Sequence, residues 1–222
     1  MLKLVSILHR RSDLGVAEFQ DYWRNTHATI VARLPGLRRY VQCHTLLAGY
    51  QKLTPAADGI AELWFDDTAA LRALDGSPEL AAVEADEAQF IDGERHQRLF
   101  IDEHVIKDGP VPADGVKNIE FVRRKAGMPV ADFQRYWREV HGPLGASIAT
   151  VTRYVQNHAR ASSYRDGRQP PLDGLALTWF ENTAAMRASA NSREYATTRD
   201  DEKNFLTEPL DFIITREHVI VA

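Results

Sequence analysis

Six of the eight histidines of this sequence form three pairs at equivalent positions in the two halves of the chain: His27 with His141, His44 with His158, and His104 with His218. Because the pKa of an unperturbed imidazole is about 6.5, histidine can accept or donate a proton at neutral pH. Each half also has a tyrosine, Tyr40 or Tyr154, four residues before its second histidine. A tyrosine hydroxyl can polarise a carbonyl or enol oxygen. These residue types predict acid–base chemistry, such as isomerisation, dehydration or decarboxylation of a small carbonyl compound or lactone.

The pairing of the histidines follows from an internal duplication. Residues 19–27, Phe-Gln-Asp-Tyr-Trp-Arg-Asn-Thr-His, match residues 133–141, Phe-Gln-Arg-Tyr-Trp-Arg-Glu-Val-His, at an offset of 114. The segment between the copies is rich in proline and glycine, which is typical of a short, stiff linker. We therefore predict two domains, residues 1–108 and residues 115–222.

The same order of elements is expected in each copy. In the first copy, β-prone and amphipathic patterns predict, in turn, a strand, a helix, two strands, an interrupted helix and a strand, at residues 2–8, 16–34, 37–47, 59–65, 68–90 and 98–106. The order βαββαβ predicts an α+β class built from two ferredoxin-like domains. Such a sheet carries helices on one face only, so we expect the second copy to cover the open face, giving a pseudo-dimeric α+β barrel within one chain.

Candidate site residues lie on the first helix and the following strand of each copy. The helical angle places His27 at the edge of the apolar stripe, where it could reach a cavity. Tyr40, Gln42 and His44 share one face of a strand by two-residue alternation, and their counterparts are Tyr154, Gln156 and His158. A row of such polar residues is expected to line a partly wet barrel interior and to contact a ligand, rather than to pack against helices. The alternative is structural: a histidine can also cap a helix or bridge neighbouring strands.

The motif Phe-x-x-Tyr-Trp-x-x-x-His, followed on the next strand by Arg-Tyr-Val-Gln, resembles the EthD family of the dimeric α+β barrel superfamily. The resemblance covers nearly all of both copies. The second copy continues as His141-Gly-Pro-Leu144, as is usual in the family, whereas the first reads His27-Ala-Thr-Ile30. By comparison with an isomerase of the family, the resemblance implies catalytic roles for one histidine and one tyrosine in each copy, namely His27 and Tyr40, and His141 and Tyr154.

Other classes of protein are disfavoured by composition. The net charge of −4 argues against a nucleic-acid partner, and the single cysteine, Cys43, excludes an internal disulfide. No apolar run is long enough to span a membrane, and the first residues do not resemble a signal peptide, so a cytoplasmic protein is expected. There is no glycine-rich phosphate loop and no His-Glu-x-x-His motif. We therefore expect neither a cofactor nor a metal. Two repeat-matched acidic pairs, Asp86-Glu87 and Asp201-Glu202, are expected on solvated helix faces.

The leading hypothesis is a cofactor-free lyase or isomerase that uses histidine and tyrosine on a small apolar carbonyl, lactone or polyketide-like compound. A non-catalytic carrier of a hydrophobic metabolite is one alternative, and a barrel-type monooxygenase is another. The sequence leaves open whether one or both copies are active and whether two chains form a further homodimer.

Overall fold

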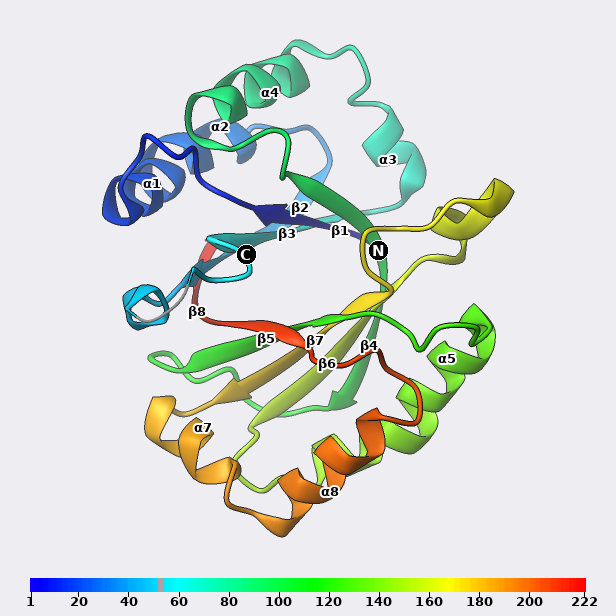
Figure 1. Cartoon of the computed structure of the whole chain (residues 1–222). Helices are drawn as coiled ribbons and strands as arrows, with labels where there is room; N and C mark the ends of the chain where they lie inside the picture. Colours follow the sequence, from blue (N-terminus) through cyan, green and yellow to red (C-terminus); the bar gives the residue numbers. More distant parts are fainter. Residues whose placement is uncertain (52–53) are drawn as a thin grey trace. The chain divides into compact units, whose positions relative to one another are not determined.

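The computed structural model describes residues 1–51 and 54–222 and divides the chain into two compact units (Figure 1). Unit 1 consists of residues 1–100 and 217–222, and unit 2 of residues 101–216. Two strands, β4 (Gln97–Lys107) and β8 (Asp211–Val221), therefore begin in one unit and end in the other. No helix within the described ranges is long and apolar enough to cross a membrane.

The elements of unit 1 follow the predicted order. They are β1 (Leu2–Leu8), α1 (Val16–Tyr22), the π-helical turn η1 (Trp23–His27), α2 (Ala28–Val31), β2 (Leu37–Thr45), the 3-10 turn η2 (Leu47–Tyr50), β3 (Gly59–Phe65), α3 (Thr68–Arg72) and α4 (Pro78–Phe90), followed by the start of β4. The helix predicted over residues 68–90 is interrupted as expected. Its second part begins after Ser77, whose hydroxyl accepts a hydrogen bond from the backbone N–H of Leu80 at 3.1 Å.

Unit 2 repeats this order. After the end of β4 it contains β5 (Val116–Val122), α5 (Val130–Tyr136), the π-helical turn η3 (Trp137–His141), α6 (Gly142–Ala146), β6 (Arg153–Ala159), the 3-10 segment η4 (Ala161–Gly167), β7 (Gly174–Phe180), α7 (Thr183–Ser189), α8 (Arg193–Glu202) and the start of β8. Ser192 caps α8 through the backbone N–H of Tyr195, at 3.1 Å, in the same way that Ser77 caps α4.

The strand pairs described within each unit are antiparallel. In unit 1, β3 lies between β1 and β2; in unit 2, β7 lies between β5 and β6, with β8 paired to β5 and β4 paired to β6. The hydrogen-bonded neighbours follow the order β1-β3-β2-β8-β5-β7-β6-β4, which closes on itself. The predicted α+β class with two βαββαβ copies is confirmed, and the closed eight-stranded order is the one that the predicted α+β barrel requires.

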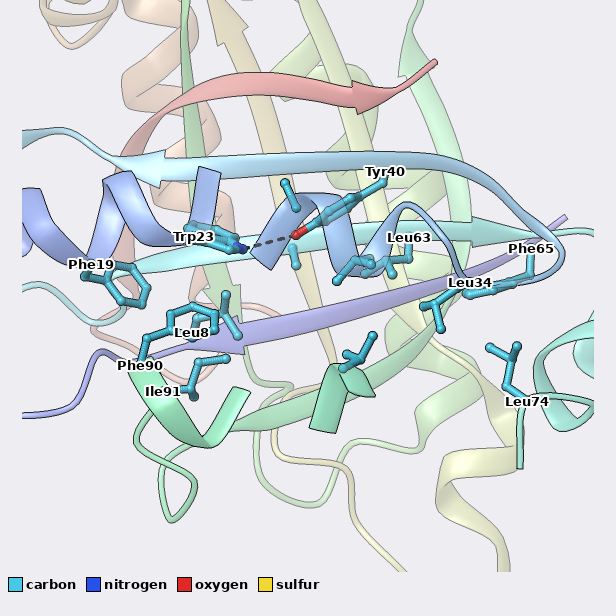
Figure 2. Close-up of a cluster of buried hydrophobic side chains, with 14 residues drawn as sticks. Leu8, Phe19, Trp23, Leu34, Tyr40, Leu63, Phe65, Leu74, Phe90 and Ile91 are labelled. Carbon is cyan, nitrogen blue, oxygen red and sulfur yellow. Dashed lines mark hydrogen bonds between the residues drawn. The ribbon is translucent and has the colours of Figure 1, made fainter. Parts of the chain in front are cut away.

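The core of unit 1 lies between its helices and one face of its sheet (Figure 2). Strand alternation brings Leu8 of β1, Leu63 and Phe65 of β3, and Tyr40 of β2 into this core. They pack with the helical residues Phe19, Trp23 and Phe90 and with Leu34 and Leu74, which follow α2 and α3. The expectation that the row Tyr40, Gln42 and His44 faces away from the helices is wrong. These residues are buried, at 1%, 0% and 5% exposure, and they face the Trp23 side because the helix offers them polar partners.

Candidate functional site

A π-helical turn brings each candidate histidine into the core. The turn η1 ends at His27 and η3 ends at His141, and both side chains are buried. In η1 the carbonyl of Trp23 accepts a hydrogen bond from the backbone N–H of Ala28, five residues on. Such a one-turn widening of a helix is frequent at functional sites. Here it places Trp23 and His27 on the same side of the helix, toward the sheet.

His27 forms a dyad with Asp86 of α4. The Nδ1 atom of His27 lies 2.7 Å from Oδ2 of Asp86, and the hydroxyl of Tyr22 donates to Oδ1 of the same carboxylate, also at 2.7 Å. The carboxylate therefore holds the proton of the ring on Nδ1 and leaves Nε2 as a base. Burial lowers the pKa of His27, and Asp86 offsets part of that shift, so the ring is neutral at pH 7.

The prediction that Asp86 belongs to a solvated helix face is wrong, because its carboxylate is the partner of a buried histidine. Asp201 is corrected in the same way by its bond to His141, and the same prediction is wrong for Glu202, which is buried. A signal was present in the sequence: both acids, together with Tyr22 and Tyr136, are repeat-matched.

A cavity of about 250 Å³ lies beside this dyad within unit 1. His27, Trp23 and Tyr40 line it, and most of the other lining residues are apolar: Leu4, Leu8, Val31, Leu34, Ala61, Leu63, Phe65, Leu71, Leu74, Leu80, Val83, Ile91 and Phe100. The remaining lining residues are polar or charged: Ser6, Asp75, Glu84, Glu87 and Arg98. Arg98 and Phe100 are exposed, so the cavity reaches solvent near the start of β4.

The hydroxyl of Tyr40 is fixed as a hydrogen-bond donor in this cavity. Its oxygen accepts from Nε1 of Trp23 at 3.1 Å and from Nε2 of Gln42 at 2.8 Å. Burial raises the pKa of Tyr40 well above its usual value, so the phenol keeps its proton. Among the described residues no acceptor takes that proton, so it is available to an oxygen atom of a bound molecule.

Gln42 and His44 hold this arrangement in place but are not among the lining residues of the cavity. Nε2 of Gln42 also donates to the Trp23 carbonyl at 2.9 Å, and its Oε1 lies 2.9 Å from Nε2 of His44. The imidazole of His44 stacks on Trp23 with ring centroids 4.3 Å apart. Burial, followed by the nearby His218 and Arg24, lowers the pKa of His44 to about 3. His44 is therefore neutral and donates to Gln42.

The same network recurs in unit 2. Nδ1 of His141 lies 2.9 Å from Oδ2 of Asp201, and the hydroxyl of Tyr136 donates to Oδ1 of the same carboxylate at 2.7 Å. Trp137 and Gln156 both donate to the Tyr154 hydroxyl, and His158 stacks on Trp137 with its Nε2 2.9 Å from Gln156. All eight candidate site residues thus occupy matched positions, four in each unit.

The surroundings of the second dyad are different. The positions of Ser6 and Glu84, which line the cavity of unit 1, correspond to Glu120 and Arg199 in unit 2. Arg199 Nη1 lies 2.9 Å from Glu202 Oε1 and 3.6 Å from Glu120 Oε1. Burial and the neighbouring Glu120 carboxylate raise the pKa of Glu202 to about 8. A charged cluster therefore stands at sheet and helix positions that line the apolar cavity in unit 1.

Cys43 is a buried thiol on the opposite face of β2 from Tyr40. Among the described residues its sulfur, with carboxylates of Glu62 and Glu217, forms a group whose ligand atoms all lie within 4.8 Å of one another. The ammonium of Lys3, however, lies 2.7 Å from Glu62 and already supplies a positive charge there. We therefore assign no metal to this group.

Fold and site together define a two-copy ferredoxin-like α+β protein with a histidine–aspartate dyad in each copy. The sequence matches the EthD domain over residues 11–94 and 125–209. The chain therefore belongs to the EthD family and carries two of its domains. No curated protein sequence matches the chain.

Solved structures with the same fold extend over the whole chain. An anthrone oxidase-like protein superposes with a TM-score of 0.68 at 6% identity, covering 100% of this chain and 94% of that one. A candidate monooxygenase from Lactobacillus acidophilus NCFM gives a TM-score of 0.59 at 10% identity, covering 98% and 94%. A candidate chlorite dismutase gives 0.56 at 10% identity, covering 98% and 95%. At these identities the similarity shows the fold alone.

Proposed function

We propose that unit 1 binds a small, largely apolar carbonyl or phenolic compound, that His27 removes a proton from it, and that the resulting anion reacts with molecular oxygen. The observation that carries this proposal is the His27–Asp86 dyad beside an apolar cavity into which Tyr40 can donate a hydrogen bond. The oxygenase class is favoured over a lyase or isomerase by the names of the structural neighbours, an anthrone oxidase-like protein and a candidate monooxygenase.

The cavity supports an apolar ligand of more than one ring. A buried cavity of about 150 Å³ lined by aliphatic and aromatic residues accepts benzene, and this one has a volume of about 250 Å³. Its apolar side chains gain free energy when a ligand excludes water from them. The few polar groups that remain, chiefly His27 and Tyr40, would fix the orientation of the ligand.

The proton transfer uses three groups of the chain. Nε2 of His27 accepts a proton from an acidic C–H or O–H of the ligand, and the carboxylate of Asp86 stabilises the imidazolium that forms. The negative charge develops on the carbonyl or phenol oxygen, where the Tyr40 hydroxyl can donate. Each step needs only a group already fixed by hydrogen bonds, so little reorganisation is required.

The oxidation balances with oxygen as the co-substrate. For a CH₂ group that is acidified by a conjugated carbonyl, as in anthrone, loss of a proton to His27 gives a carbanion, which adds O₂ to form a peroxide that recovers the proton. Loss of water from the hydroperoxide then leaves a new carbonyl group. The sum is one CH₂ plus one O₂ giving one C=O plus one H₂O.

The test is oxygen consumption by the full chain with anthrone as the probe substrate, followed with an oxygen electrode and by quantifying the quinone product. We expect one O₂ per product and a loss of roughly 10²- to 10⁴-fold in turnover for His27→Gln. His141→Gln is the matched control, with turnover close to that of the unmodified chain. Equal turnover by His27→Gln would overturn the proposal.

Two other outcomes would also overturn it. Exchange of the acidic C–H with solvent deuterium across a panel of ketones and lactones, without O₂ uptake, would show a lyase or isomerase. Saturable binding with neither exchange nor O₂ uptake would show a carrier.

A further inference from the structure

We propose that unit 2 has a second binding site, separate from the dyad, that takes an oxyanion group such as the phosphate or carboxylate of a small molecule. The site is an open cavity of about 250 Å³ beside the turn that follows β5. The turn contributes Arg123, Arg124 and Lys125, and the facing wall is the segment before β7, from Gln169 to Asp173. The proposal does not rest on the proposed function of unit 1.

The cavity has an excess of positive charge. Three consecutive cations line it, and Asp173 is its only acidic lining residue. The carboxylate of Asp173 is already fully engaged: it accepts from the backbone N–H of Arg124 at 2.9 Å, from the guanidinium of Arg124, and from the hydroxyl of Tyr164 at 2.7 Å. Asp173 therefore neutralises Arg124 and leaves the charges of Arg123 and Lys125 without a matching carboxylate in the lining.

The donors in this cavity outnumber the acceptors. Among the described residues, the exposed guanidinium of Arg123 has no hydrogen-bond or ion-pair partner. Gln169 accepts from Arg124 at 2.8 Å through Oε1, which leaves its NH₂ group as a donor. The backbone N–H groups of Ala126 and Gly127 likewise have no partner in the described part of the chain. A ligand that completes these hydrogen bonds must supply acceptors, and an oxyanion does so with its charge matched as well.

The equivalent turn of unit 1 has a carboxylate that the turn of unit 2 lacks. There Arg10 pairs with Asp58, as Arg124 pairs with Asp173. Arg11, the counterpart of Lys125, is held by the carboxylate of Asp13 through two hydrogen bonds of 3.0 and 2.8 Å. In unit 2 the position of Asp13 is Gly127, so the carboxylate is absent.

The position before the paired arginine differs as well. Arg123 stands where unit 1 has His9, a buried side chain whose pKa is lowered by desolvation. In unit 1, Arg10 and Arg11 each pair with a carboxylate of the chain. In unit 2, three cations line the cavity, and Asp173 is the one carboxylate among the lining residues. An external oxyanion would accept hydrogen bonds from Lys125 and Arg123, as the carboxylate of Asp13 does from Arg11. Because guanidinium groups match the geometry of both phosphate and carboxylate, the ligand class is an acceptor-rich anion of either kind.

The experiment is calorimetric titration of the full chain with inorganic phosphate and, separately, with acetate, at constant ionic strength set by sodium chloride. The constant ionic strength removes general screening as a cause of any difference. We expect saturable binding of at least one of the two anions with one site per chain. The anion that binds more tightly shows whether the ligand group is a phosphate or a carboxylate. No saturable binding of either anion would overturn the proposal.

The matched variants locate the site. Arg123→Ser combined with Lys125→Ser should weaken binding by about tenfold or more, because two charged hydrogen-bond donors are removed. Arg11→Ser, in the equivalent turn of unit 1, should leave the affinity unchanged. The substituted side chains are exposed, and an unchanged melting curve confirms folding. Equal binding by the double variant, or equal weakening by Arg11→Ser, would overturn the proposal. Neither result depends on turnover at His27.

Discussion

The two units hold the same hydrogen-bond network and differ in what surrounds it. In each, a tryptophan, a tyrosine, a glutamine and a histidine connect the π-helical turn to the sheet. In unit 1 the space beside this network is a largely apolar cavity. In unit 2 its lining residues Leu4 and Val83 correspond to the polar Asn118 and Thr198, and Ser6 and Glu84 correspond to Glu120 and Arg199. The network was retained in both copies, so it serves the fold of each. The residues around it diverged, and they determine which chemistry each unit can support.

The largest difference in turnover between variants of the two units is expected at the aspartates of the two dyads. Asp86→Asn removes the charge that stabilises the His27 imidazolium, so turnover should fall by roughly 10²- to 10⁴-fold. Asp201→Asn should leave turnover nearly unchanged.

The measurement is turnover as a function of pH. For the unmodified chain the neutral imidazole is the active form, and burial lowers the pKa of His27, so turnover should persist at neutral pH and fall as acidification protonates the ring. Equal losses in the two variants would show that both units are active.

The second effect concerns the position that carries serine in unit 1 and glutamate in unit 2. Ser6→Glu places a carboxylate in the apolar cavity, and an unpaired buried charge is costly, so ligand affinity should fall by roughly 100-fold. Ser6→Gln is the control for size, with a smaller loss. The measurement is the affinity for anthrone. If Glu120→Ser in unit 2 weakens binding to the same extent, the cavity of unit 1 is not the binding site.

The third effect is a pH dependence of stability that belongs to unit 2. The pKa of Glu202 is raised to about 8 in the folded chain and is about 4.3 when unfolded. The folded state therefore binds the proton more tightly between these values. The contribution of Glu202 to stability is fully present below about pH 4.3 and is lost as the pH rises toward 8.

Glu202→Gln should remove this loss and raise the free energy of unfolding at pH 8 by about 1–3 kcal/mol. Urea unfolding at pH 5 and pH 8 measures it. Glu87→Gln, at the matched position of unit 1, should not show the same gain, and a flat pH dependence in the unmodified chain would contradict the assignment.

The smallest effect tests what the units share. Ser77→Ala and Ser192→Ala each remove the side-chain cap of a helix, so each should lower the free energy of unfolding by about 1 kcal/mol. Thermal unfolding of the two variants measures the cost. Markedly different values would show that the two helices do not contribute equally to their units.

The duplication made much of the fold predictable from the sequence. Two matched sets of strand and helix patterns predicted the element order twice. The predicted interruption of the helix over residues 68–90 is confirmed, and its second part begins at Pro78 because proline begins a helix more readily than it continues one. His27 and Tyr40 lie together in the lining of the cavity, and their catalytic roles stay a prediction.

The partners of these residues were harder to predict. Alternation along β2 placed Tyr40, Gln42 and His44 on one face, but it could not tell which face the helices cover. The answer depends on a contact with the π-helical turn, where Gln42 donates to the Trp23 carbonyl, and no alternation pattern in the strand predicts that contact. Asp86 was missed because a charged residue on a short helix is usually solvated, and its contact with His27 joins residues 59 positions apart.

The passage of β4 and β8 from one unit to the other has a consequence for biosynthesis. Unit 1 contains the candidate catalytic histidine, yet its residues 217–222 follow the whole of unit 2 in the sequence. During translation the second copy is synthesised to residue 216 before the first unit receives this strand segment. Unit 1 therefore cannot be completed before unit 2 has been synthesised.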